Sequence, residues 1–74
     1  RALAQSMARE FGPQGIHVAH VVIDGQIASE RHAGRAAETL LDPAAIAENY
    51  YRLYRQDPTA WTQELDLRPA VERF

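Results

Sequence analysis

The sequence predicts an α/β fold in which helices connect strands of a parallel sheet. An amphipathic stretch over residues 1–12 ends at a Gly-Pro turn and leads into a β-branched run over 16–23. The same order returns over 42–57 and 60–68, so the chain reads helix, strand, long loop, helix, strand. Parallel strands require such helical crossovers. Because two strands are not a stable sheet by themselves, we expect the other strands to come from preceding sequence or from neighbouring chains.

The first helix is predicted from apolar residues at helical spacing. Leu3, Met7 and Phe11 recur every four residues, with Ala4 and Ala8 beside them. The Gly-Pro dipeptide after Phe11 ends the helix, because Pro cannot continue the hydrogen-bond ladder and Gly suits a left-handed cap. The small residues allow close packing against a sheet or another helix.

The run over 16–23 is nearly all Val, Ile and other apolar residues. Such a continuous run is typical of a strand that is buried on both faces of a parallel sheet. His17 and His20 are three positions apart, so on a strand they point to opposite faces and do not converge on a metal ion. No metal site is predicted, and we assign both histidines to packing or ordinary polar roles.

The segment over 24–41 is a long connection with small and charged residues, in which 33–41 can form a short helix. Loops of this length in compact domains are often lids or binding segments. If this one covers a substrate, we expect Ala28, Leu40 and Leu41 to supply apolar lining.

An Asp-Pro pair begins the second predicted helix, over 42–57, because Asp caps free N–H groups and Pro suits the first turn. Ile46, Tyr50 and Leu53 mark its apolar face, with Tyr54 at the margin. A second Asp-Pro pair ends it.

The last strand, over 60–68, is predicted from strict alternation, which is typical of a half-buried strand at a sheet edge. One face carries Trp61, Gln63, Leu65 and Leu67, and the other carries Thr62, Glu64, Asp66 and Arg68. Beyond it, we expect Val71 and Phe74 to pin the tail.

Composition bounds the function. The chain has 74 residues, a net charge of −2 with interspersed acids and bases, and no cysteine. A single small domain without a basic patch argues against nucleic-acid binding. No apolar run approaches the ~20 residues that cross a bilayer, so no membrane association is expected. The lack of cysteine fits an intracellular setting, and we expect a cytoplasmic location. The sequence begins at Arg1 inside a helical pattern, which indicates a piece of a longer chain.

Four segments together resemble the short-chain dehydrogenases/reductases. Residues 6–18, Ser-Met-Ala-Arg-Glu-Phe-Gly-Pro-Gln-Gly-Ile-His-Val, resemble the stretch that follows the catalytic Tyr-x-x-x-Lys of that family. Residues 24–29, Asp-Gly-Gln-Ile-Ala-Ser, resemble its Pro-Gly-x-Ile/Val-x-Thr motif. Residues 42–56 resemble the helix after the substrate loop, and 60–69 resemble the last strand of a divergent branch. Two departures stand out, since Asp24 replaces Pro and Ser29 replaces Thr, the latter keeping the hydroxyl.

The resemblance implies the C-terminal part of a Rossmann-like, doubly wound parallel sheet. It implies NAD or NADP as cofactor and a small-molecule carbonyl or alcohol as substrate. Carried over, the cofactor-facing residues are Asp24, Gly25, Ile27 and Ser29. No catalytic residue is assigned, because the family's Gly-rich loop and its catalytic Asn, Ser, Tyr and Lys have no counterpart in these 74 residues. The longer protein is then an enzyme, while this segment alone is inactive. From spacing alone, without the resemblance, Asp24-Gly25 is interpreted as a turn dipeptide.

In that family the last helix and strand often form a subunit interface, which implies a homo-oligomer anchored by Tyr54, Trp61 and the last strand. The alternative is a non-catalytic α/β interaction or oligomerisation module. The residues encoded just before Arg1 distinguish the two, because a Tyr-x-x-x-Lys a few positions upstream indicates the enzyme.

Overall fold

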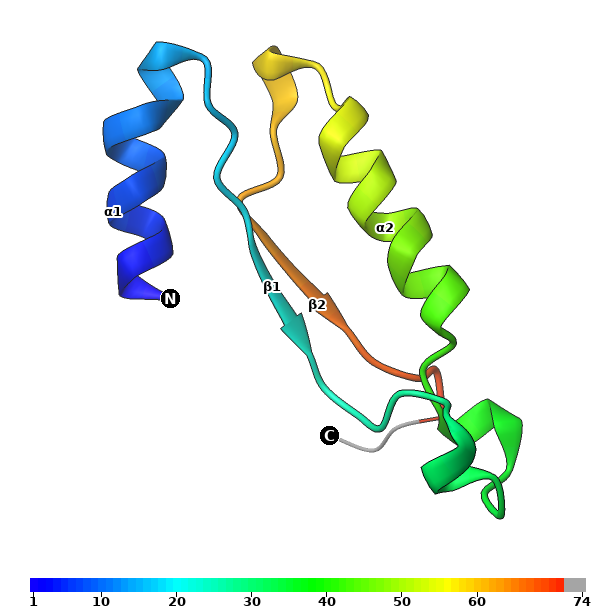
Figure 1. The fold of residues 1–74 in the computed structure, drawn as a ribbon. Coiled ribbons are helices and arrows are strands. Elements are labelled where there is room, and N and C mark those ends of the chain that lie inside the picture. The colour runs from blue at the N-terminus through cyan, green and yellow to red at the C-terminus, as the bar shows by residue number, and fades with distance from the viewer. Residues whose placement is uncertain (72–74) are drawn as a thin grey trace.

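A computed structural model describes residues 1–71. It contains the helices α1 (Ala2–Phe11) and α2 (Pro43–Arg55), and the strands β1 (His20–Ile23) and β2 (Glu64–Leu67). The two strands are parallel and adjacent, with His20 opposite Glu64 and Ile23 opposite Leu67. In sequence, α2 connects β1 to β2, so the chain contains the α/β crossover that the sequence predicts (Figure 1).

The helices lie on opposite faces of the strand pair (Figure 1). Side chains alternate along a strand, so His20 and Glu64 share one face while Leu65 and Leu67 share the other. Glu64 forms an ion pair with Arg1, at the start of α1, over 2.7 Å. The other face lies under α2, whose Ile46 and Leu53 are buried. The arrangement is therefore helix, sheet, helix in three layers.

Helix α1 contacts the sheet through small residues rather than through its large apolar ones. Ala8 is its buried residue, whereas Leu3 and Met7 are exposed. Small side chains allow the helix to approach the strands, and the large side chains then point outward. In α2 the buried face is formed by Ile46 and Leu53, and Tyr50, predicted on that face, is exposed.

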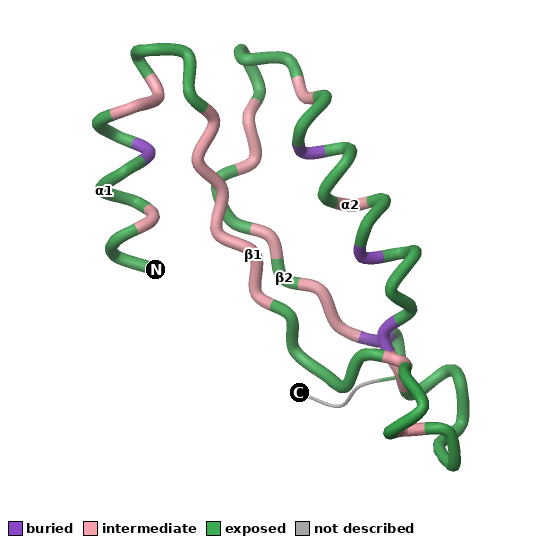
Figure 2. The backbone as a smooth tube through the Cα atoms, in the orientation of Figure 1, coloured by how far each residue is buried: buried purple, intermediate pink, exposed green. Residues whose placement is uncertain are grey.

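The first predicted strand, over 16–23, is shorter in the structure and is not buried. Only His20–Ile23 pairs with β2, and these residues are half-buried or exposed (Figure 2). Burial of this strand on both faces in a larger sheet stays a prediction, because this chain supplies β1 with a single neighbouring strand. Residues 16–19 lie outside the ladder, and there His17 Nε2 donates a hydrogen bond to the Thr62 carbonyl over 2.7 Å.

The second predicted strand, over 60–68, begins later, at Glu64. Asp57 caps a short 3-10 turn over Pro58–Ala60, and the Gln56 side chain then binds both the amide and the hydroxyl of Thr62. These local bonds hold residues 58–62 outside the ladder. The backbone and side-chain hydrogen bonds from Thr59 lower the pKa of Asp57 below its ordinary value, so this cap weakens as the pH falls through that lowered pKa.

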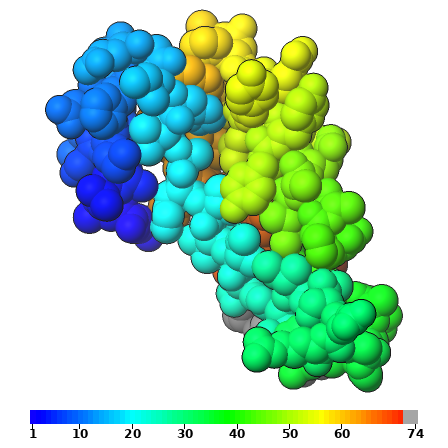
Figure 3. All heavy atoms as spheres, viewed as in Figure 1, coloured from blue at the N-terminus to red at the C-terminus, as the bar shows by residue number. Residues whose placement is uncertain are grey.

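The connection between β1 and α2 contains two 3-10 turns, Glu30–His32 and Ala37–Thr39, in place of a helix over 33–41. It forms a lobe at one end of an elongated molecule of 46 × 23 × 19 Å (Figure 3). Asp42 caps α2 as predicted, accepting a hydrogen bond from the Ala44 amide over 3.1 Å, with Pro43 in the first turn. Of the tail residues expected to pack, Val71 is exposed and Phe74 lies outside the described residues.

No helix in the part of the chain described is long and apolar enough to cross a membrane.

Candidate functional site

The predicted cofactor-facing residues follow β1 at the carboxyl edge of the sheet. Parallel strands end at the same edge, so the segment after β1 meets the segment after β2 there, and ligands of open α/β sheets bind at this edge. Asp24, Gly25, Ile27 and Ser29 are all exposed in the structure. The hydrogen bonds and backbone angles of these residues determine which groups at this edge are available to a ligand.

Asp24 is tied to the end of β2 by its backbone and by its side chain. Its amide donates to the Leu67 carbonyl over 2.9 Å, which continues the parallel ladder by one residue. Its carboxylate pairs with the Arg68 guanidinium over 3.1 Å. Arg68 also binds both carboxylate oxygens of Asp66. Asp24 is therefore held at the start of the loop by two contacts with the end of β2.

Gly25 has a backbone conformation that excludes other residues. Its φ is +147°, a region that L side chains rarely adopt. A Cβ at this position would lie 3.1 Å from Pro69 Cδ and 3.4 Å from Leu41 Cδ1. Glycine is thus required here by the backbone angle and by the approach of two neighbouring segments.

Ile27 forms an isolated parallel bridge with Leu41. The residues on either side of it make the bonds, since the Gln26 carbonyl accepts from the Leu41 amide over 2.8 Å and the Ala28 amide donates to the Leu41 carbonyl over 2.7 Å. Peptide groups alternate in direction along such a segment. The N–H and C=O of Ile27 therefore point away from Leu41, and neither has a hydrogen-bond partner within residues 1–71.

Ser29 begins the first 3-10 turn, and its carbonyl accepts from the His32 amide over 3.0 Å. Its hydroxyl makes no capping bond, so it is exposed beside the same edge. Of the apolar lining expected in the loop, Ala28 and Leu40 are half-buried, and Leu41 is buried beneath the Ile27 bridge. Leu41 therefore holds the segment over 26–28 through its backbone hydrogen bonds, while its side chain is buried.

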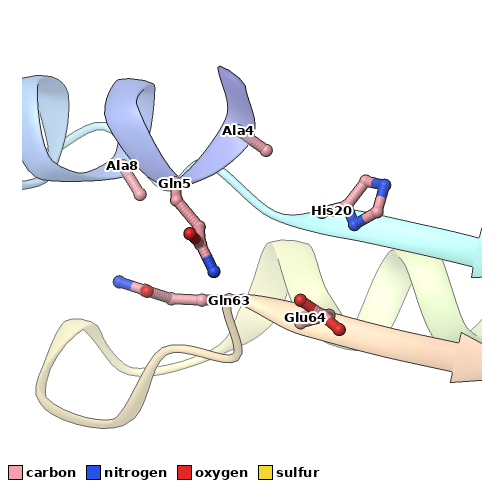
Figure 4. A pocket seen from close by; sticks show the side chains of 6 residues that line it. All are labelled: Ala4, Gln5, Ala8, His20, Gln63 and Glu64. Atoms are coloured by element: carbon pink, nitrogen blue, oxygen red, sulfur yellow. The ribbon is translucent and has the colours of Figure 1, made fainter. Parts of the chain in front are cut away.

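The structure does not bring the predicted residues into an enclosed cavity. A hollow of about 190 Å³ lies between α1 and the strands, and its lining includes Gln5, His20 and Glu64 (Figure 4). A second, of about 160 Å³, lies between α2 and the end of β2 and includes Leu67 and Arg68. His20 lines the first hollow, and its Nδ1 is buried without a hydrogen-bond partner. Within the described residues, no group of three or more metal-ligating side chains gathers.

Sequence reasoning missed the contribution of Arg68, which it placed only on the polar face of a strand. Asp24 and Arg68 are far apart in sequence, and only the strand register brings them together. Parallel pairing of the two predicted strands could have indicated this contact. It places the residue that follows β1, Asp24, next to the residue that follows β2, Arg68.

The two residues predicted to anchor an oligomer differ in their surroundings. Tyr54 is 82% exposed on the outer side of α2. Trp61 is half-buried and stacks on His17, with ring centroids 4.6 Å apart and planes within 3°. Trp61 therefore has a role within the chain, where it joins the segments that precede β1 and β2.

Comparison with known proteins gives one informative match. No family model and no curated protein matches the chain. The structure is similar to the crystal structure of a short-chain dehydrogenase from Rhodopseudomonas palustris, with a TM-score of 0.68 and 45% sequence identity. The match covers 93% of this chain and 25% of that one, so the chain spans about a quarter of the length of its structural neighbour.

Proposed function

We propose that the chain is the C-terminal part of a Rossmann-like, NAD(P)-dependent oxidoreductase, because its structure is similar over 93% of its length to part of a short-chain dehydrogenase. In that protein it forms the nicotinamide side of the cofactor site. The bound cofactor supplies hydride exchange with a carbonyl or alcohol carbon. The residues of this chain bind and orient the cofactor. The proton-transfer groups lie outside it in this proposal, because the Tyr-x-x-x-Lys pair of the family has no counterpart in a sequence without lysine.

The observation that carries the proposal is the pair of backbone groups on Ile27. A primary carboxamide offers one acceptor oxygen and an NH₂ donor. The Ile27 N–H and C=O are a matching donor and acceptor on one residue, directed away from Leu41 and unpaired within residues 1–71. The exposed Gly25, which has no side chain, allows a flat ring to approach the backbone.

The neighbouring residues have supporting roles in this proposal. Ser29 is exposed two residues further along the loop, and its hydroxyl makes no capping bond. The loop over 28–41, which forms the lobe in Figure 3, covers a small carbonyl or alcohol substrate and limits access of water to the ring. Asp24 fixes the start of the segment, through the two contacts that tie it to the end of β2.

Cofactor binding by the complete natural protein tests this function. Titration with NADH and with NADPH, followed by the fluorescence of the reduced ring, is expected to give saturable binding of at least one. The isolated 74-residue chain is expected to reduce no carbonyl substrate with either cofactor. Absence of binding of both cofactors by the complete protein would contradict the proposal, and so would turnover by the isolated chain.

We further propose that α2 and the outer edge of β2 form a contact between two copies of the protein. Tyr54 supports this, because an aromatic side chain that is 82% exposed is typical of an interface anchor. We expect Tyr54→Ala to reduce the mass of the complete protein in solution, measured by light scattering during size-exclusion chromatography. Arg35→Ala, in the exposed loop at the other end of the molecule, is the control and should leave the mass unchanged. An unchanged mass for Tyr54→Ala would exclude Tyr54 as an anchor.

A further inference from the structure

We propose that Arg68 is a positioning residue that holds the nicotinamide-facing segment in place through its ion pair with Asp24. The inference rests on the proposed function, because it assigns a role at that same site. Gly25 has no side chain that could hold the segment over 24–27 in one conformation, so other contacts must do so.

The guanidinium of Arg68 lies between two carboxylates. It pairs with Asp24 over 3.1 Å and binds both oxygens of Asp66. Its side chain is 22% exposed, whereas those of Asp24 and Asp66 are 49% and 48% exposed. A planar, always-charged fork is suited to hold two carboxylates at once, and partial burial limits screening of the pairs by solvent.

The contacts of Arg68 fix one end of the segment, and Leu41 fixes the other. Asp24 is held by the Leu67 carbonyl and by Arg68, and Ile27 is held by its bridge to Leu41. Gly25 stands between these two points with a φ of +147°. A glycine loses more conformational freedom on ordering than any other residue, so its geometry depends on the contacts at its two ends.

The two peptide groups of Ile27 are held by their neighbours' bonds to Leu41, whereas the peptide groups over 24–26 depend on Asp24. If the Asp24 side chain is released, the peptide groups on either side of Gly25 can rotate, and the position of Gly25 beside the Ile27 groups is no longer fixed. The ion pair is then expected to affect recognition of the nicotinamide end of the cofactor and to leave its adenosine end unaffected.

The test compares two carboxylates that share the same arginine. Asp24→Asn removes the ion pair that reaches the segment and keeps the backbone amide bond to Leu67. Asp66→Asn removes the other ion pair, at a side chain of nearly equal exposure, without touching the segment. Dissociation constants are measured for each form of the complete natural protein with two ligands. The first is the preferred reduced cofactor, and the second is ADP-ribose, which lacks the nicotinamide. If NADPH is the preferred cofactor, the 2′-phosphate form of ADP-ribose is used.

We expect Asp24→Asn to weaken binding of the reduced cofactor about threefold to tenfold and to change that of the ADP-ribose ligand by less than about twofold. Asp66→Asn is expected to change neither by more than about twofold. Equal losses for the two ligands in Asp24→Asn, equal losses in the two variants, or no loss in Asp24→Asn would each overturn the positioning role. Failure of the unaltered protein to bind the reduced cofactor would instead overturn the proposed function.

Discussion

Gly25→Val is expected to abolish measurable cofactor binding at concentrations that saturate the unaltered protein. Its backbone has a φ of +147°, which costs a β-branched residue about 1–3 kcal/mol of strain. The new side chain also meets Pro69 and Leu41, so the segment must move away from the end of β2. Because the Ile27 backbone groups move with it, the loss is expected in the affinity for the reduced cofactor, measured by fluorescence titration.

Gly34→Val is the matched control in the same loop. A Cβ at Gly34 would meet nothing within 4 Å, and its φ lies outside the left-handed region. This variant is expected to bind the cofactor as the unaltered protein does. If Gly25→Val also binds normally, the close approach of the 24–27 segment to Pro69 has no part in cofactor recognition.

Leu53→Ala is expected to lower the free energy of unfolding by about 2–4 kcal/mol. Leu53 is 8% exposed and, with Ile46, forms the buried face of α2. Its truncation removes packing and leaves a cavity at the contact that holds the crossover on the sheet. Urea denaturation of the complete natural protein measures the change.

Tyr51→Ala, on the outer side of the same helix, is the control for Leu53. Tyr51 is 56% exposed, and truncation there is expected to change the free energy of unfolding by less than about 0.5 kcal/mol. Equal losses in the two variants would show that the buried face of α2 is not the one described.

Features set by neighbouring residues were predictable from sequence. The presence of helix α1 and the Asp-Pro pair that begins α2 both depend on residues a few positions apart, and the structure shows each of them, although Leu3 and Met7 of α1 are exposed. The strand limits were not predictable, because they depend on the partner. Strand β1 begins at His20 because its partner strand begins at Glu64. The residues before Glu64 form a turn, and Thr62 there bonds to the Gln56 side chain rather than to β1.

The same distinction applies to the site. Local sequence is sufficient to place Gly25 and Ile27 just beyond a strand, at the edge where α/β sheets bind ligands. The groups that hold them, Arg68, Pro69 and Leu41, approach from distant parts of the chain. Hydrophobic patterning predicts that an edge exists, whereas the side chains that meet there follow from the register of two strands and one bridge.

The most direct test of the nicotinamide assignment is a crystal structure of the complete natural protein with its preferred oxidised cofactor bound. The distances to measure run from the backbone N and O of Ile27 to the carboxamide of the nicotinamide. Both are expected to be hydrogen bonds of about 2.7–3.2 Å, with Gly25 beside the ring. A carboxamide held by other residues, with the Ile27 groups bonded elsewhere or to water, would contradict the assignment.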